Sequence, residues 1–173
     1  AVIPMQQSFD KLTFLVGNRD TLTAMPRLPA LAPFDERVLT LLQSLSERLR
    51  GERAYSDVVT FAFWCRRAAL THAKAQYDDL AERMGRGVVF HIAPSNVPVN
   101  FAFSLVSGLL AGNANIVRVP SKAFAQVEII CAALRELLSG EFSDLAPYLC
   151  LVRYPADKTV NDALSALCDV RVI

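Results

Sequence analysis

The chain has 173 residues, a length that suits one domain or a large part of one. Its formal net charge of +1 gives no basic field to collect nucleic acid, and its lysines and arginines form no run that would bind a membrane surface. The composition is 53% hydrophobic with a mean hydropathy of +0.29, which predicts a sizeable core and an apolar surface that something else covers.

Residues 1–84 are predicted to form an N-terminal segment with an irregular start and two helices. Prolines and a glycine punctuate residues 1–33, where only residues 11–16 have the pattern of a short strand. A first helix is predicted between a capping Asp35 and the terminating Gly51. Its apolar stripe consists of Val38, Leu41, Leu42, Leu45 and Leu49.

The second predicted helix starts near residues 56–57, and its apolar spacing fades toward Met84. Its aromatic cluster is interpreted as helix packing. The cluster consists of Phe61, Phe63 and Trp64.

Residues 85–173 alternate between strand and helix patterns and are predicted to form part of a nucleotide-binding domain. The predicted strands are 87–93, 115–119, 148–153 and 169–173. Such alternation indicates an α/β fold, a Rossmann-like parallel sheet with helices on both faces. The chain ends on a strand without a following turn, so we expect this sheet, preceded by the two N-terminal helices, to be incomplete.

The connection after the first of these strands is the most informative candidate site, since open α/β sheets bind ligands beyond the carboxyl ends of their strands. Ser95 or Asn96 can cap the following helix, and Pro98 is tolerated in its first turn. Free N–H groups at the helix start would face an anion, and the Asn96 amide could donate to a developing oxyanion. The alternative is that Asn96 is only a cap and turn residue.

Charged and polar residues also follow the second strand. Arg118 could bind ribose hydroxyls or a phosphate, or it could be a solvated charge. Ser121 and Lys122 open the next predicted helix, where a plain cap is the alternative. His91 lies inside a strand and is interpreted as a packed core histidine.

Standard nucleotide and hydrolase signatures are absent from the sequence. No G-x-G-x-x-G follows the first strand of the α/β half, and there is no G-x-x-x-x-G-K-[ST], G-x-S-x-G or HExxH. A dinucleotide would therefore bind without the usual glycine turn.

Targeting and redox features indicate a cytoplasmic protein without a metal site. The start resembles no signal peptide, and the most apolar stretch, 97–112, is shorter than the ~20 residues of a membrane span. The cysteines form no CxxC pair and have no histidine at ligand spacing, which favours reduced thiols rather than nucleophiles or ligands. They are Cys65, Cys131, Cys150 and Cys168.

Two stretches carry a family resemblance: GVVFHIAPSNVP at residues 87–98 and LLAGNANIVRVPS at residues 109–121. They resemble the aldehyde dehydrogenase superfamily. Within it they are closest to the acyl-CoA reductase family that includes the fatty acyl-CoA reductase of bacterial bioluminescence. The resemblance covers residues 85–173 well and the first 84 loosely.

The resemblance implies a role for individual residues. Asn96 matches an asparagine that helps to form an oxyanion hole, and Arg118 replaces a lysine that holds the adenosine ribose or phosphate. Ser121, beside Lys122, stands where NAD-preferring members often have an acid, which favours NADPH over NAD. The remaining residues implied in cofactor binding are Ile92, Ala93, Pro94, Ser95 and Pro120.

The resemblance therefore implies the N-terminal cofactor-binding portion of an NADPH-dependent acyl-CoA reductase, which converts (fatty) acyl-CoA to aldehyde through a cysteine thioester and is homo-oligomeric when intact. The nucleophilic cysteine would lie in a domain beyond Ile173, so this chain alone is predicted to be inactive. The alternatives are an NAD(P)-dependent aldehyde dehydrogenase fragment, a non-catalytic nucleotide- or CoA-binding module, and an interaction protein.

Overall fold

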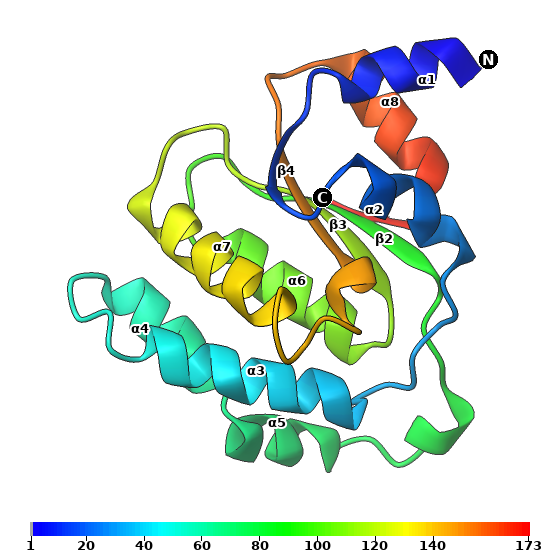
Figure 1. Cartoon of the computed structure of the whole chain (residues 1–173). Coiled ribbons are helices and arrows are strands. Elements are labelled where there is room, and N and C mark those ends of the chain that lie inside the picture. The colour runs from blue at the N-terminus through cyan, green and yellow to red at the C-terminus, as the bar shows by residue number, and fades with distance from the viewer. Residues whose placement is uncertain (1) are drawn as a thin grey trace.

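The computed structural model describes residues 2–173 and has the α/β fold predicted from the sequence (Figure 1). Ala1, the first residue of the predicted N-terminal segment, lies outside the described residues. In the described part of the chain, five strands form one sheet in the spatial order β1-β4-β3-β2-β5. The strands are β1 (Thr13–Val16), β2 (Val88–Ile92), β3 (Ala114–Arg118), β4 (Leu149–Arg153) and β5 (Val170–Val172).

The strand pairing places a topological switch point beside β2. The strand pairs β2–β3, β3–β4 and β2–β5 are parallel, which confirms the predicted parallel sheet, whereas β1 joins the edge antiparallel to β4. The chain runs outward from β2 through β3 to β4 and then returns to the other side of β2 as β5. The crevice beyond the carboxyl ends of β2 and β5 is thus the place where sheets of this kind bind ligands.

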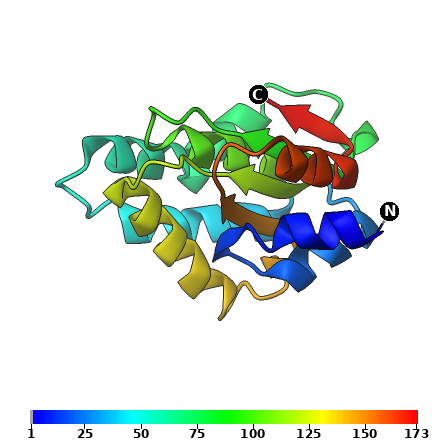
Figure 2. The ribbon, with the colours of Figure 1, turned by 90° about the horizontal axis from the view of Figure 1, so that it is seen from above.

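Helices cover both faces of the sheet, as predicted (Figures 1 and 2). On one face, α6 contacts β2 and β3, and α3 packs across α6 and α7. On the other face, α8 contacts β2 and packs against α1. The helices are α1 (Val2–Phe9), α2 (Arg19–Ala24), α3 (Glu36–Leu49), α4 (Ser56–Trp64), α5 (Arg67–Lys74), α6 (Asn100–Leu110), α7 (Ala125–Leu138) and α8 (Lys158–Leu167), with 3₁₀ turns η1 (Met25–Arg27), η2 (Leu80–Glu82) and η3 (Ala146–Tyr148).

The three central strands share one burial pattern. In each of β2, β3 and β4 the first four residues are buried and the last is partly exposed. Continuous burial is typical of parallel strands that have helices on both faces, and it explains their unbroken apolar runs. The partly exposed last residues, Ile92, Arg118 and Arg153, mark the carboxyl edge of the sheet.

The first predicted helix is confirmed as α3. Its N-cap Asp35 accepts a hydrogen bond from the backbone N–H of Arg37 at 2.9 Å, and the helix ends two residues before Gly51. All five residues of the predicted apolar stripe are buried. The second predicted helix is divided into α4 and α5 at Cys65–Arg66, although the apolar spacing continues across this break.

The stretch predicted to be irregular contains two helices, α1 and α2. Asn18 caps α2 by accepting a hydrogen bond from the Thr21 N–H at 3.0 Å, while Thr21 Oγ1 accepts one from the Asn18 N–H at 3.2 Å. This reciprocal cap uses threonine where the usual signature has Glu or Gln, so the sequence pattern concealed it.

The helices α6 and α7 begin later than predicted. The N-cap of α6 is Val99, and neither Ser95 nor Asn96 caps it, because a residue before proline disfavours the helical conformation and the start therefore moves past Pro98. Likewise, the predicted cap at Ser121 is wrong. The chain stays extended through Phe124, which packs partly against the core, and α7 begins only after it.

Gly108 lets α6 lie close to the sheet. A Cβ atom at this position would lie 2.0 Å from Asn115 Oδ1 on β3 and 2.9 Å from His91 Nε2 on β2. The buried side chains of β2 and β3 thus occupy the space that a side chain at position 108 would need.

No helix within residues 2–173 is both long and apolar enough to cross a membrane.

We predict that Gly108→Ala destabilises the protein by about 1–3 kcal/mol, because the added methyl group must displace the hydrogen-bonded Asn115 side chain. Urea unfolding measures this change. Gly51→Ala is the matched control, since nothing lies within 4 Å of its Cβ position, and it should change stability by less than about 0.5 kcal/mol. Equal effects of the two substitutions would contradict the close packing of α6.

Candidate functional site

A cavity of about 380 Å³ lies at the switch point between β2 and β5. Three of the residues predicted to bind a cofactor line it, namely Ile92, Ala93 and Pro94. We call it the carboxyl-edge cavity. Its other lining residues are Trp64, Asn100, Phe103, Ser104, Ser107, Val172 and Ile173.

The loop between β2 and α6 carries Ser95 and Asn96 at the same edge of the sheet. Both are exposed, and neither lines the cavity. The Asn96 side chain has no hydrogen-bond partner among the described residues. Because Val99 caps α6 without a side-chain hydrogen bond, the first N–H groups of this helix also lack a side-chain acceptor. Both the amide of Asn96 and the helix start are thus available to a ligand.

Arg118 is brought to this edge by the parallel register of β2 and β3. Its backbone carbonyl accepts a hydrogen bond from the Ala93 N–H at 3.2 Å, so two predicted cofactor residues are directly joined. The guanidinium lies 4.4 Å from the centre of the Tyr154 ring and donates to the Tyr154 carbonyl at 3.2 Å. This stacking orients the cation and leaves other N–H donors for a ligand.

The buried partner of Arg118 is itself held in place. The hydroxyl of Tyr154 donates to Asn161 Oδ1 on α8 at 2.5 Å. Burial raises the pKa of Tyr154 to about 12, although the nearby Arg118 opposes the shift. The tyrosine therefore stays neutral, and it presents a fixed aromatic face to the guanidinium.

The predicted residues after β3 lie beside Arg118 but outside the carboxyl-edge cavity. Pro120 is buried, and its carbonyl accepts from Arg153 Nε at 3.3 Å. Ser121 and Lys122 are exposed, with the Lys122 ammonium 5.1 Å from the centre of the Phe124 ring. The structure thus groups the predicted residues into two neighbouring sets, one after β2 and one after β3.

The connection after β4 differs from the connections after β2 and β3. Asp157 caps α8, where its carboxylate accepts from the N–H groups of Thr159 at 2.8 Å and Val160 at 3.3 Å. It also pairs with Lys11, and hydrogen bonds from Lys11 and Thr159 lower the pKa of Asp157. The protein's own carboxylate therefore occupies the anion-binding end of α8, whereas the starts of α6 and α7 have no side-chain cap.

A buried polar chain lies beneath the carboxyl-edge cavity. Asn115 Nδ2 donates to the Asn113 carbonyl at 2.9 Å, so its Oδ1 faces His91 Nε2, which donates at 2.9 Å. The neutral ring then accepts at Nδ1 from Ser104 Oγ, 2.7 Å away, and Ser104 lines the cavity. Burial lowers the pKa of His91, which supports the interpretation of a packed core histidine.

The cysteines are poorly placed for nucleophilic chemistry. Cys65, Cys131 and Cys150 are buried, and burial raises the pKa of each thiol to about 12. Burial also raises the pKa of the partly exposed Cys168, whose thiol donates to the Ser165 carbonyl at 3.1 Å. Within residues 5–173, no cluster of three or more His, Cys, Asp or Glu side chains is arranged to hold a metal ion.

Sequence reasoning missed the aromatic wall of the cavity. Of the cluster interpreted as helix packing, only Phe61 is buried, while Phe63 and Trp64 are exposed. Trp64 on α4 contacts Phe103 on α6, with ring centres 5.1 Å apart, and both line the cavity. The position of Trp64 outside the apolar stripe of its helix was the one available signal.

Comparison with known proteins identifies one family. A family model described as acyl-CoA reductase (LuxC) matches residues 15–173, a range that includes every predicted site residue. Searches of curated proteins and of solved structures found no match.

We predict that protonation of His91 destabilises the fold in mild acid. Its pKa in the folded chain is below the ordinary 6.5, so between about pH 7.5 and 5.5 the unfolded state binds more protons and stability falls as the pH falls. Urea unfolding across this range measures the slope. His91→Gln should flatten it, whereas His72→Gln, at an exposed residue of α5, should leave it unchanged. A slope that persists in His91→Gln would contradict the assignment.

Proposed function

The chain belongs to the acyl-CoA reductase (LuxC) family, and we propose that it is the N-terminal, cofactor-binding portion of an NADPH-dependent reductase that converts (fatty) acyl-CoA to aldehyde. The observation that carries the proposal is the carboxyl-edge cavity. It lies at the switch point of the sheet, and Ile92, Ala93 and Pro94 line it.

The donors at this edge fit a dinucleotide phosphate. Arg118 is oriented by Tyr154 with free N–H groups, and the starts of α6 and α7 have no side-chain cap. Arg118 would hold the adenosine ribose or a phosphate, while the strand-end residues after β2 would lie along the cofactor. A bound NADPH would supply the hydride for reduction of the acyl group.

The proposed preference for NADPH over NADH rests on charge. Residues 119–127 contain Lys122 and no Asp or Glu, so nothing there repels a 2′-phosphate. Ser121 is exposed and has no carboxylate that would hold two free ribose hydroxyls. The loop after β3 therefore accepts an additional phosphate group.

In this proposal Asn96 donates a hydrogen bond to the oxyanion that forms when the acyl carbon is attacked. The exposed amide has no competing partner among the described residues, and its loop follows the strand that lines the cavity. An amide donor at such a position would stabilise the developing negative charge.

The nucleophile would come from outside this chain. Each of the four thiols is kept protonated by burial, and thiolates rather than thiols attack thioesters. We therefore propose that the chain alone catalyses no acyl-CoA reduction and that a cysteine in a further domain carries the acyl group.

We predict that the chain binds NADPH more tightly than NADH and that Ser121→Asp removes this preference. A carboxylate beside the 2′-phosphate should weaken NADPH binding about tenfold, or ~1.4 kcal/mol, with little effect on NADH. Isothermal titration calorimetry measures both. Arg53→Gln is the control, since this exposed arginine is far from the site in sequence and its side chain has no partner among the described residues. Undiminished NADPH binding by Ser121→Asp would refute the placement of the phosphate.

We also predict that Asn96→Ala lowers kcat about 10²–10³-fold in a protein that joins this chain to its nucleophilic cysteine, because the substitution removes an oxyanion donor. Steady-state kinetics with an acyl-CoA substrate measure the loss. The exposed side chain makes no contact that folding requires, so the thermal midpoint should not change. A loss under about threefold would leave Asn96 as a loop residue without a part in the chemistry.

A further inference from the structure

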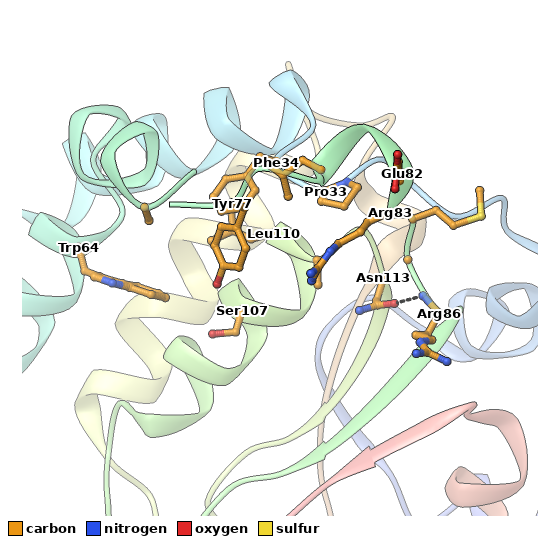
Figure 3. A pocket seen from close by; sticks show the side chains of 15 residues that line it. Pro33, Phe34, Trp64, Tyr77, Glu82, Arg83, Arg86, Ser107, Leu110 and Asn113 are labelled. Carbon is orange, nitrogen blue, oxygen red and sulfur yellow. Dashed lines mark hydrogen bonds between the residues drawn. The ribbon is translucent and has the colours of Figure 1, made fainter. Parts of the chain in front are cut away.

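A second and larger cavity, of about 730 Å³, lies at the opposite end of the sheet (Figure 3). It is bounded by the segment that leads into β2, by the residues after α5 and by the last turns of α6. We call it the amino-end cavity. Its volume is within the range of about 300–1,000 Å³ that small-molecule sites occupy.

Apolar side chains form one wall of the amino-end cavity. Three exposed apolar residues converge on it: Trp64 is 36% exposed, Tyr77 49% and Met84 72%. Phe34 and Leu110 line the same cavity, and the Phe34 and Tyr77 ring centres are 6.1 Å apart. Apolar surface concentrated in this way indicates a binding site more often than chance exposure does.

Phe34 holds its place in this wall through an uncommon backbone conformation. Its φ is +54°, and its N–H donates to the Leu110 carbonyl at 2.8 Å. A bulky residue rarely adopts this left-handed conformation, and such conformations cluster at functional sites.

The opposite wall carries the amide group of a largely buried asparagine. Asn113 is only 6% exposed, and its Oδ1 accepts from the Arg86 N–H at 2.6 Å. The amide nitrogen therefore faces the cavity, where it has no partner among the described residues (Figure 3). An amide nitrogen that faces the cavity without a protein acceptor can donate a hydrogen bond to an acceptor oxygen of a ligand.

Arg83 extends its guanidinium over the cavity toward Asn113 and Leu110 (Figure 3). The guanidinium pairs with Asp79 at 2.8 Å, which raises the pKa of Arg83 and leaves other N–H donors free. Glu82 is also a lining residue, but it stands at the rim, away from Asn113. The positive guanidinium and the amide donor thus converge beside the apolar wall.

We propose that the amino-end cavity binds an amphipathic anion, an apolar chain that bears a carboxylate or phosphate group. The anionic group lies between the guanidinium of Arg83 and the amide nitrogen of Asn113. The apolar chain lies along Tyr77 and Leu110 toward Trp64. The anion-binding end of this site lies away from the proposed cofactor site at the carboxyl edge, although the two cavities share Trp64 in their lining. The inference does not depend on NADPH binding.

Trp64 is the single tryptophan and lines both cavities, so its fluorescence reports occupation of either one, and substitutions are needed to locate the ligand. Dodecanoate, added below its critical micelle concentration, should change the fluorescence saturably. Dodecanol and dodecyltrimethylammonium should bind at least about tenfold more weakly, because they lack the anionic group. Equal binding of dodecanol would overturn the proposed anion site, and so would the absence of saturation with every anionic ligand tested.

Three substitutions locate the ligand. Asn113→Asp keeps the acceptor for the Arg86 N–H but replaces the amide donor with a negative oxygen, so it should weaken dodecanoate binding at least about tenfold. Arg83→Gln should also weaken it, whereas Arg53→Gln should not. Circular dichroism verifies that each variant is folded. Unchanged affinity in both Asn113→Asp and Arg83→Gln would overturn the proposal.

Two further ligands distinguish the sources of the anion. Saturable binding of CoA without an acyl chain, lost in Asn113→Asp, would identify the phosphates of CoA as the anionic group. Binding of dodecanoate but not of CoA would identify a free fatty acid. NADPH binding should be unchanged in Asn113→Asp, so failure of this site and failure of the proposed cofactor site give different results.

Discussion

The contact between Gly108 and the Asn115–His91 pair fixes the position of helix α6, and both cavities depend on that position. Because α6 has no side chain at this point, it lies directly over the buried amide and imidazole of the two neighbouring strands. One flank of α6 then helps to line the carboxyl-edge cavity through Ser104, and its last turns line the amino-end cavity through Leu110. A displacement of this helix would alter both sites together.

The buried Asn115 and His91 side chains find their hydrogen-bond partners within the protein. This matters because burying a polar group without a partner costs free energy. Asn115 and His91 are hydrogen-bonded to each other beneath the helix. His91 is also bonded to Ser104, and Asn115 to the Asn113 carbonyl. Asn113 continues this chain of hydrogen bonds to the Arg86 N–H through its side-chain oxygen. The polar chain thus extends from the wall of one cavity to the wall of the other.

Helices α6, α7 and α8 each follow a parallel strand, but their starts differ in whether a carboxylate caps them. The start of α8 is occupied by Asp157, whereas the starts of α6 and α7 have no side-chain cap. Arg118 stands between these two at the end of β3, held by the neutral ring of Tyr154. The uncapped helix starts and the Arg118 guanidinium thus lie at the same edge of the sheet, beside β2 and β3, where the proposed cofactor would lie.

The sequence predicts the central sheet and α3 well because burial leaves a local pattern there. Strands β2, β3 and β4 are buried on both faces and therefore appear as unbroken apolar runs. The short helix α1 leaves no such pattern, since it is stabilised by packing against the distant α8. The starts of α6 and α7 were misplaced because polar residues that commonly cap helices precede the true starts.

The sites could be predicted only in part for a similar reason. Ile92 and Arg118 end strands and Ala93 and Pro94 follow one, and parallel pairing brings strand ends to a common edge. Trp64, by contrast, reaches the cavity only through its contact with Phe103 on another helix. Such contacts between distant elements leave no periodic trace in a single sequence.

The central claim is that the carboxyl edge of the sheet beside β2 and β3 binds the nicotinamide cofactor. Amide chemical-shift mapping of the ¹⁵N-labelled chain during titration with NADPH tests it most directly. The largest shifts should occur in residues 92–97 and 118–122, with little change at Arg83 and Asn113. Shifts confined to the amino-end cavity, or none at saturating NADPH, would contradict it.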